Sequence, residues 1–279
     1  MQLTRSKLLR RFALGLGSGF LVAACGVSRS TPPPPATGAP EDADKPLKVG
    51  TAPPFPPFEM KNDQGELVGF DIDLLTAISK QTGQTFEIET LAFEDIVPAL
   101  QDGRIDAAIS AIPVTPERSQ AIDFSHPYLD AGLVIAVRQS EQAITSEADL
   151  EGKTLAVQID TAGASKAIEI LGSKIITFST AAEAIEALAA GQADAVIHDK
   201  PVVLHAITLL SQSSTTAAQD LATIRLVERP LTYQVYGIAL PQNSAHTATL
   251  NEAIEALVAN GTYAEIYEKW FGTAVAARP

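Results

Sequence analysis

One pattern occurs twice in this chain and constrains its fold more than any other feature. Residues 99–109 read ALQDGRIDAAI, and residues 187–197 read ALAAGQADAVI. Each copy has the marks of a helix end, a glycine stop, a short turn with Asp and then an apolar strand. Asp106 and Asp194 stand 88 positions apart, which is too far for a solenoid repeat and suits one copy in each of two lobes. Two such lobes would bring the carboxyl ends of strands to one crevice, where open α/β sheets bind ligands.

The composition and charge limit the classes of function. Of the 279 residues, 46% are hydrophobic and 19% are charged, as in a globular protein. The formal net charge is −13, and residues 1–24 hold four cations and no acid, so the remainder is at −17. Because phosphate binding requires clustered cations, nucleic acid is excluded as a partner. The acidic surface is interpreted as a solvated one that keeps the protein soluble.

The N-terminus predicts export and anchoring. Residues 1–24 combine a basic start, an apolar run and small residues, which is typical of a signal peptide. The only cysteine, Cys25, follows the sequence LVAA. This resembles a bacterial lipobox, in which the thiol is lipidated, whereas the alternative is an ordinary signal peptide with a chance cysteine. Residues 25–46 then form a disordered linker, rich in Ser, Thr, Pro and Ala. We expect a protein in the periplasm or at the cell surface, anchored to the membrane through Cys25.

Strand and helix patterns alternate along the rest of the chain. Strands are predicted at 47–51, 86–89, 105–111, 132–138, 154–158, 193–198 and 236–240. Helices are predicted from residue 70 to Gly83, over 94–102, after Thr115 and Thr180, and twice near the C-terminus. This alternation predicts an α/β class with parallel sheets. Because the chain has four His, no Cys beyond Cys25 and no phosphate-binding glycine loop, we expect no metal and no cofactor.

A series of short motifs carries a resemblance to a known family. They are Pro57–Glu59, Gly69–Leu74, Thr115–Arg118, Ile122–Ser125, Leu150–Lys153, Asp194–Val196 with Asp199, Tyr236–Ala239 and Asn260–Tyr263. Over residues 47–272 the chain resembles bacterial extracellular solute-binding proteins of family 3, the polar amino-acid receptors of ABC importers. The resemblance implies a two-lobed periplasmic binding protein fold of type II with two crossing hinge strands. Lobe 1 would hold 47–131 plus 237–279, and lobe 2 would hold 132–236, with a ligand drawing them shut.

Three polar residues receive roles from this resemblance. Arg118 stands in the first turn of a predicted helix, which the helix dipole disfavours for a cation. The resemblance implies that it pairs with the α-carboxylate of a ligand, while the alternative is a surface Arg paired with an acid. Asp199 would accept the ligand's α-ammonium group, or it starts the next helix as a cap. His198 either lines the pocket or simply ends the strand.

Further positions match the walls of the family's pocket. Phe55 and Phe93 match aromatic residues that enclose the ligand's side chain, and the alternative is core packing. Thr161 and Ala162 match a turn in the second lobe whose hydroxyl and backbone N–H hold the carboxylate. Ser110 would offer backbone groups from the end of the first repeat, together with its neighbour Ala111.

Two departures from the family pattern bear on the ligand. Pro113 stands where relatives usually carry a Thr that gives a hydroxyl and an N–H to the ligand, and proline has neither. Either another donor substitutes, or the α-amino-acid headgroup is bound differently or not at all. Ala52 replaces an acidic residue that reads a polar or cationic side chain in some relatives, which argues against a cationic ligand held in that manner.

The sequence therefore predicts the substrate-binding component of an ABC importer. It would be a monomer that captures a small zwitterionic solute, with an amino acid as the first expectation, and delivers it to an ABC permease. One alternative is a dehydratase-type enzyme on the same scaffold, which requires a cleft acid or base such as Asp199 or His198. The other is a ligand-sensing module that signals through a separate membrane partner.

Overall fold

The structure, a computed structural model, describes residues 45–159, 161–212 and 224–272. The predicted signal peptide, Cys25 and most of the predicted linker lie outside these residues. None of the helices in the described ranges combines the length and the apolar character that a bilayer-spanning segment requires.

The first five-stranded sheet has the strand order β4-β1-β5-β14-β6. Its strands are Leu47–Thr51 (β1), Phe86–Thr90 (β4), Ala107–Ala108 (β5), Asp123–Phe124 (β6) and Ala239–Leu240 (β14). β1 runs parallel to both β4 and β5, whereas β14 is antiparallel to β5 and β6. The chain thus returns to this sheet near its C-terminal end.

The second five-stranded sheet has the order β10-β9-β11-β8-β12. Its strands are Leu133–Arg138 (β8), Thr154–Gln158 (β9), Lys174–Phe178 (β10), Ala195–Asp199 (β11) and Ile224–Leu226 (β12). β9 is parallel to β10 and β11, and β8 is antiparallel to β11 and β12. The prediction of parallel sheets is therefore wrong for part of each sheet, because β14 in the first sheet and β8 in the second run antiparallel to their neighbours. A parallel strand needs a crossover connection, and β8 enters its sheet with no helix before it.

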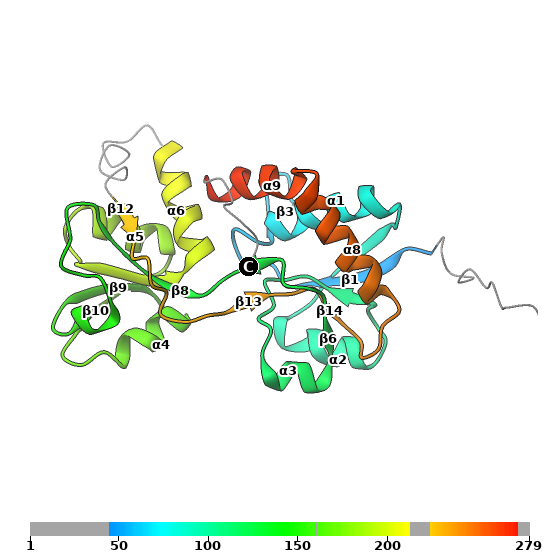
Figure 1. Cartoon of the computed structure of the whole chain (residues 1–279), viewed down its shortest axis with the longest axis horizontal. Coiled ribbons are helices and arrows are strands. Elements are labelled where there is room, and N and C mark those ends of the chain that lie inside the picture. Colours follow the sequence, from blue (N-terminus) through cyan, green and yellow to red (C-terminus); the bar gives the residue numbers. More distant parts are fainter. Residues whose placement is uncertain (1–44, 160, 213–223, 273–279) are drawn as a thin grey trace, which may run out of the picture. The chain divides into compact units, whose positions relative to one another are not determined.

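Two chain segments connect the regions of the two sheets. Leu129–Asp130 (β7) pairs antiparallel with Val235–Tyr236 (β13), and Figure 1 shows β13 crossing between the sheets. A separate hairpin pairs Met60–Lys61 (β2) with Leu67–Val68 (β3). The predicted strand 236–240 is in fact divided into β13 and β14. The two pieces pair with different partners, and the backbone N–H of Ile238 between them donates to the Ser125 hydroxyl at 2.9 Å.

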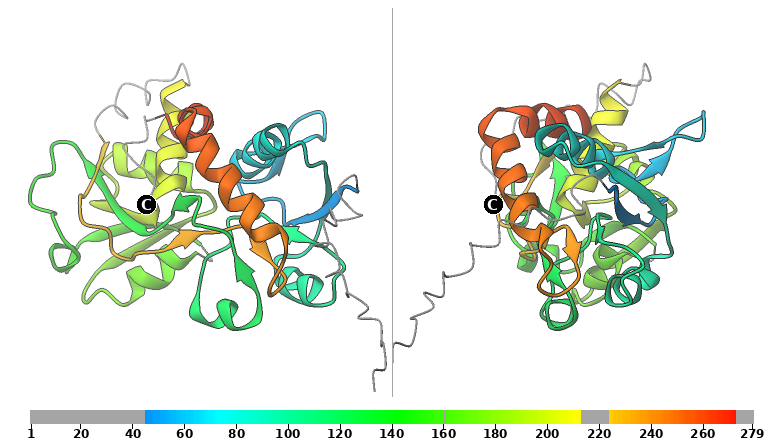
Figure 2. Two further views of the ribbon diagram at one scale, coloured as in Figure 1. Left: turned by 45° about the vertical axis from the view of Figure 1, so that its right-hand side comes forward. Right: turned by 90° about the vertical axis from the view of Figure 1, so that its right-hand side faces the viewer.

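Helices cover both sheets. The α-helices are Phe70–Thr82 (α1), Ile96–Gln101 (α2), Pro116–Ala121 (α3), Ala162–Ile168 (α4), Ala181–Ala189 (α5), Lys200–Gln212 (α6), His246–Ala259 (α8) and Thr262–Phe271 (α9). Short 3₁₀ turns span Phe93–Asp95 (η1) and Glu147–Leu150 (η2). α4, α5 and α6 pack on the second sheet, while α1, α8 and α9 pack on one another. The views in Figure 2 show α8 and α9, in orange and red, beside each other.

The repeated pattern has the same structural role in both sheets. The backbone N–H of Asp106 donates to the carbonyl of Lys48, and its carboxylate accepts from the N–H of Lys48, both at 2.8 Å. Asp194 makes the same two bonds with Thr154, again at 2.8 Å. Each aspartate therefore fixes its strand against the neighbouring parallel strand, β1 in the first sheet and β9 in the second.

The first repeat's strand is shorter than predicted. Only Ala107–Ala108 has strand geometry, where the sequence predicts a strand over 105–111. Ala111 has a positive φ of 45° and donates its N–H to the carboxylate of Asp71 at 2.7 Å. This bond turns the backbone out of the sheet and shapes the strand end that the pattern predicts at the crevice.

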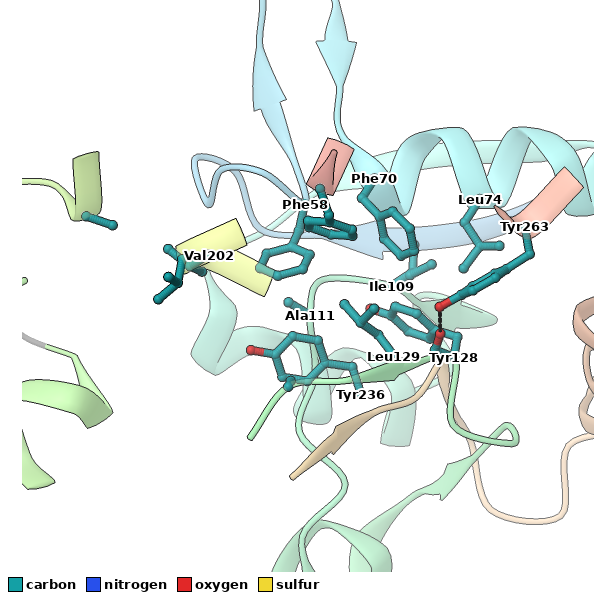
Figure 3. Packing of buried hydrophobic residues seen from close by; sticks show 14 of the residues in the cluster. Phe58, Phe70, Leu74, Ile109, Ala111, Tyr128, Leu129, Val202, Tyr236 and Tyr263 are labelled. Carbon is teal, nitrogen blue, oxygen red and sulfur yellow. Dashed lines mark hydrogen bonds between the residues drawn. The ribbon is translucent and has the colours of Figure 1, made fainter. Parts of the chain in front are cut away.

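The start of α1 docks on the loop that precedes the β2–β3 hairpin. The N–H groups of Phe70 and Asp71 donate to the carbonyls of Pro57 and Phe58 at 2.8 and 3.0 Å. Figure 3 shows Phe58 and Phe70 in the same buried cluster, where the ring centre of Phe271 lies 6.4 Å from that of Phe58 and 5.0 Å from that of Phe70. Gly69 has a φ of 147° and a ψ of 170°, and a Cβ atom there would stand 1.9 Å from the Phe58 carbonyl oxygen. This close approach therefore requires glycine.

We expect Gly69→Ala to destabilise the protein by at least about 3 kcal/mol, because it adds both backbone strain and a steric clash. Thermal unfolding followed by circular dichroism measures this loss. Gly65→Ala is the matched control, since Gly65 also has a positive φ of 80°, and a Cβ atom added there would have no other atom within 4 Å. The control should lose only about 1 kcal/mol. Equal losses in the two variants would show that close docking at Gly69 is unimportant.

Candidate functional site

A cavity of about 450 Å³ is lined by residues that follow both copies of the repeated pattern. Its lining comprises Ala52, Pro54, Phe55, Glu59, Phe93, Ala111, Pro113, Ala162, Asp199, Gln234 and Tyr236. Ala111 stands at the end of the first repeat and Asp199 at the end of the second. The carboxyl ends of the two equivalent strands therefore meet at one cavity, as the repeat predicts.

Two aromatic side chains form an exposed wall of this cavity. Phe55 is 36% and Phe93 is 40% exposed, so core packing is the wrong interpretation of both. The loop of Phe55 is closed by its N–H, which donates to the carbonyl of Glu59 at 2.7 Å. Its ring centre lies 5.2 Å from that of the buried Phe58. This contact holds an otherwise exposed ring in place at the cavity.

Arg118 is held beside the cavity by two of its lining residues. Its guanidinium lies 5.1 Å from the ring centre of Phe93, and its Nη1 donates to the carbonyl oxygen of Pro113 at 3.1 Å. Burial lowers the pKa of Arg118 and the nearby Glu117 opposes that shift. Within the described residues, no carboxylate lies within ion-pair distance of Arg118. Arg118 therefore retains guanidinium donors for another acceptor.

The position of Arg118 on its helix differs from the sequence prediction. Thr115 caps α3 as predicted, accepting from the N–H of Arg118 at 3.3 Å, and Pro116 opens the helix. The helix has only six residues, so Arg118 belongs to its last turn as well as its first. The dipole argument against a cation at this position therefore carries little weight. The stacking on Phe93 is the stronger indication of a role at the cavity.

Asp199 presents a carboxylate to the cavity from the second sheet. It is the last residue of β11 and directly precedes α6. Burial raises the pKa of Asp199 to about 6, because water is withdrawn from the charged form. Its Oδ2 lies 3.6 Å from Nδ1 of His198. An incoming cationic group would supply the stabilisation that this carboxylate lacks.

His198 is buried beneath Asp199 and is absent from the cavity lining. Its Nδ1 accepts the backbone N–H of Asp199 at 2.7 Å, which places the ring proton on Nε2. That Nε2–H donates to the side-chain oxygen of Gln158 at 2.9 Å. Burial lowers the pKa of His198 to about 4, so the ring is neutral at pH 7. Of the two interpretations of His198, this geometry favours the strand end.

The turn at the start of α4 brings Ala162 to the cavity. Thr161 caps this helix, its hydroxyl donating to the carbonyl of Gln158 at 2.8 Å and accepting from the N–H of Ala164 at 3.2 Å. The hydroxyl is thus engaged within the protein. Gly163 allows the helix to approach β11, because a Cβ there would stand 2.3 Å from the carbonyl oxygen of Ile197.

At the end of the first repeat, the Ser110 hydroxyl and the predicted backbone donor of Ala111 are engaged within the protein. The Ser110 hydroxyl donates to Oε1 of Glu59 at 2.5 Å and accepts from the N–H of Ala52 at 3.1 Å. Ala111 gives its N–H to Asp71. Ala111 lines the cavity and the buried Ser110 precedes it, and these two residues, held by internal hydrogen bonds, are termed the floor of the cavity.

Sequence reasoning did not identify three polar lining residues: Glu59, Gln234 and Tyr236. Glu59 and Tyr236 lie in motifs that carry the family resemblance but received no role of their own. Figure 3 shows the Tyr236 ring in the buried cluster with its hydroxyl pointing away from the cluster. Burial and the charge of Asp199 both raise the pKa of Tyr236, so the phenol is protonated at neutral pH. It is a neutral hydroxyl on the cavity wall.

The arrangement provides charge of both signs around an apolar space. Arg118 offers a planar set of donors on one side, and Asp199 offers a carboxylate from the other sheet. Phe55, Phe93 and Tyr236 supply aromatic surface between them. A small molecule with a carboxylate, an ammonium group and a partly apolar body matches this distribution.

Known proteins resemble this chain over most of its length. Residues 47–273 match the family described as bacterial extracellular solute-binding proteins, family 3. The L-arginine-binding protein of Pseudomonas aeruginosa is 29% identical over 235 residues, covering 82% of this chain and 89% of that protein. ABC transporter arginine-binding protein 1 of Escherichia coli strain K12 is 30% identical over 228 residues, covering 81% and 90%.

A solved structure supports the fold. An ancestral cationic amino acid solute-binding protein is 34% identical, with a TM-score of 0.68 over 81% of this chain and 95% of that one. The predicted two-lobed periplasmic binding protein fold is therefore confirmed, while the residue boundaries predicted for the lobes stay a prediction. The match over residues 47–273 shows that this chain belongs to the bacterial extracellular solute-binding proteins of family 3.

Proposed function

We propose that this protein is the substrate-binding component of an ABC importer and captures an amino acid in the described cavity. The observation that carries the proposal is the opposite charge of Asp199, which lines the cavity from the second sheet, and Arg118, which stands beside the cavity on the lining residues Phe93 and Pro113. Relatives named as arginine-binding proteins support the class of ligand. The partner that receives the ligand is an ABC permease.

Binding uses both charged ends of the amino acid. The α-carboxylate pairs with the free donors of Arg118, whose planar group suits a bidentate contact. The α-ammonium group pairs with Asp199, which compensates the cost of burying that carboxylate. Because the two residues belong to different lobes, a ligand that contacts both favours the closed arrangement of the lobes. We place lobe 1 at 47–131 plus 237–279 and lobe 2 at 132–236.

The ligand's side chain faces Phe55 and Phe93. Ala52 contributes no charge to the cavity wall, and Glu59 is fully buried behind it. With Arg118 and Asp199 engaged by the headgroup, the exposed wall carries no charge, since Phe55 and Phe93 are apolar and Gln234 and Tyr236 are neutral. This composition favours an amino acid with an uncharged side chain.

The geometry supports binding over the dehydratase alternative. A general acid or base needs a nitrogen or oxygen that can exchange a proton with the substrate. Both ring nitrogens of His198 are engaged, one by the N–H of Asp199 and the other by Gln158. The predicted pair of His198 and Asp199 therefore offers one carboxylate and no free imidazole.

We expect amino acids with uncharged side chains to raise the melting temperature of the protein, since a ligand that binds only the folded state stabilises it by mass action. A thermal-shift screen of the twenty amino acids, betaines and small carboxylates measures this. Prephenate and arogenate, incubated with the protein, should remain unchanged. A response confined to compounds without an ammonium group, or turnover of either acid, would contradict the proposed function.

We expect Arg118→Ala to lose at least about 2 kcal/mol of binding free energy for the best ligand of that screen, because a charge-assisted bidentate contact disappears. Isothermal titration calorimetry measures the change. Arg104→Ala is the control, since Arg104 pairs at 3.5 Å with Glu89, whereas Arg118 stacks on the lining residue Phe93. Unchanged affinity in Arg118→Ala would remove Arg118 from the site.

We propose that the mature protein is a monomer anchored to the membrane by a lipid on Cys25, with residues 26–46 as its tether. Expressed in a lipoprotein-processing bacterium, the protein should appear in the membrane fraction, and Cys25→Ala should move it to the soluble fraction. Ser28→Ala, a linker change that leaves the thiol, should stay with the membrane. Membrane retention of Cys25→Ala would contradict the anchor, and light scattering tests the monomer.

A further inference from the structure

Two buried carboxyl groups lie beneath the cavity and have no part in the proposed contacts with the ligand. Glu59 and Asp71 are both 0% exposed. Glu59 follows the Phe55 loop, and Asp71 is in the first turn of α1. Acidic side chains are almost never fully buried unless they have partners. Their arrangement therefore needs a physical explanation.

The fold connects these two side chains on both sides. On one side, the N–H of Asp71 donates to the carbonyl of Phe58, the residue before Glu59, at 3.0 Å. On the other side, the consecutive residues Ser110 and Ala111 bond to Glu59 and Asp71 respectively. Two short connections thus hold the carboxyl groups as neighbours.

The hydrogen bonds leave one oxygen of each carboxyl group without a donor. Asp71 Oδ2 accepts from the N–H of Ala111 at 2.7 Å and from the hydroxyl of Tyr128 at 2.9 Å. Glu59 Oε1 accepts from the hydroxyl of Ser110 at 2.5 Å. Glu59 Oε2 and Asp71 Oδ1 are buried and have no hydrogen-bond partner among the described residues. Two neighbouring buried carboxylates with such unpartnered oxygens would be costly.

We propose that Glu59 is a neutral carboxylic acid that donates its proton from Oε2 to Oδ1 of Asp71, and that this shared proton holds the Ser110–Ala111 floor of the cavity in place. One proton satisfies both unpartnered oxygens and leaves a single negative charge on the pair. The charge belongs to Asp71, because its Oδ2 accepts two donors while Glu59 accepts one. Glu59 and Asp71 are thus positioning residues.

The surroundings of the pair favour this protonation state. Burial and the charge of Asp71 raise the pKa of Glu59 to about 10, against the opposing bond from Ser110. Burial raises the pKa of Asp71 to about 7, while the bonds from Ala111 and Tyr128 lower it. The titratable groups that face the pair are Tyr128 and, on β13, Tyr236, whose pKa the charge of Asp199 also raises. Both phenols are neutral, so neither compensates a second negative charge.

The shared proton matters for the cavity because Ala111 is held in an unfavourable conformation. Its φ of 45° is uncommon for a residue with a side chain, and the bond to Asp71 maintains it. Loss of the proton would place two negative charges beneath Ser110 and Ala111. The consequence for ligand binding rests on the proposed function, whereas the shared proton itself does not.

The shared proton makes folding stability depend on pH in a defined direction. The folded-state pKa of Glu59 is raised from its ordinary value of 4.5 to about 10. The folded protein therefore binds this proton more tightly than the unfolded chain does. The resulting stability is fully present below the ordinary pKa and is lost as the pH rises toward 10. The pKa of Asp71 is also raised, to about 7, so its contribution to folding stability is likewise lost as the pH rises toward 7.

The test compares Glu59→Gln with the unchanged protein between pH 7 and pH 10. The Gln amide donates permanently to Asp71 and its oxygen accepts from Ser110, so it imitates the neutral acid. The melting temperature should fall over this interval in the unchanged protein and fall less in Glu59→Gln. Glu59→Ala, which cannot donate, should melt lower than Glu59→Gln at pH 7. Glu87→Gln makes the same change at an exposed residue of β4, and its melting temperature should fall as much as that of the unchanged protein.

A second measurement observes the proton directly. In protein labelled with carboxyl-¹³C glutamate, NMR at pH 7 should show one protonated carboxyl group, and Glu59→Gln should remove that signal. Absence of a protonated glutamate at pH 7, or an equal fall in melting temperature in Glu59→Gln, would overturn the proposal. The NMR arm needs no variant to detect the proton, and neither arm needs a ligand. Their outcomes are thus separate from a failure of the proposed function.

Discussion

The parallel strand pairs at the centre of both sheets depend on one interaction, a reciprocal pair of hydrogen bonds between an aspartate and the neighbouring strand. Asp106 exchanges bonds with Lys48, and Asp194 exchanges the same bonds with Thr154. These bonds fix the register of each strand pair. Because successive side chains of a strand point to opposite faces, a slip of one residue would redirect everything that follows. The cavity exists because both registers hold.

From this common framework, the two copies end in different chemistry. The first copy ends in Ser110 and Ala111, which bond to buried acids and form a floor. The second ends in His198 and Asp199, where a neutral buried ring supports the backbone of an acid that faces the cavity. The repeat therefore places the two strand ends alike, whereas the asymmetry of charge that a zwitterion requires comes from Asp199 after the second copy and from Arg118, farther along the chain after the first.

Local signals account for the parts of the fold that the sequence predicted well. Thr180 and Glu183 form both bonds of the predicted capping box, and Gly83 ends α1 with a φ of 76°. These features depend on residues a few positions apart. The division of 236–240 into two strands was not predictable in this way, because it depends on partners far away in the chain.

The burial of Glu59 and Asp71 shows a second limit of sequence reasoning. An acid in the first turn of a helix is ordinarily explained by the helix dipole, and Asp71 fits that pattern. Asp71 lies in the interior, beside another acid, only because α1 docks on the Phe55 loop. His198 shows the same limit, since both of its possible roles fit a strand end. The two roles are distinguished by the contacts of the ring with Gln158 and with the N–H of Asp199, which only the folded structure shows.

Pro113 shows how a lost donor can be compatible with a binding site. Proline cannot give an N–H or a hydroxyl to a carboxylate, yet its carbonyl oxygen accepts Nη1 of Arg118. Any residue at 113 could offer this carbonyl, and here the backbone at Pro113 is held by its β-bridge to Tyr236 on β13. The stacking on Phe93 restrains the same guanidinium from its face. An orientated Arg118 loses less conformational freedom on binding a carboxylate, and this gain offsets part of the missing hydrogen bond.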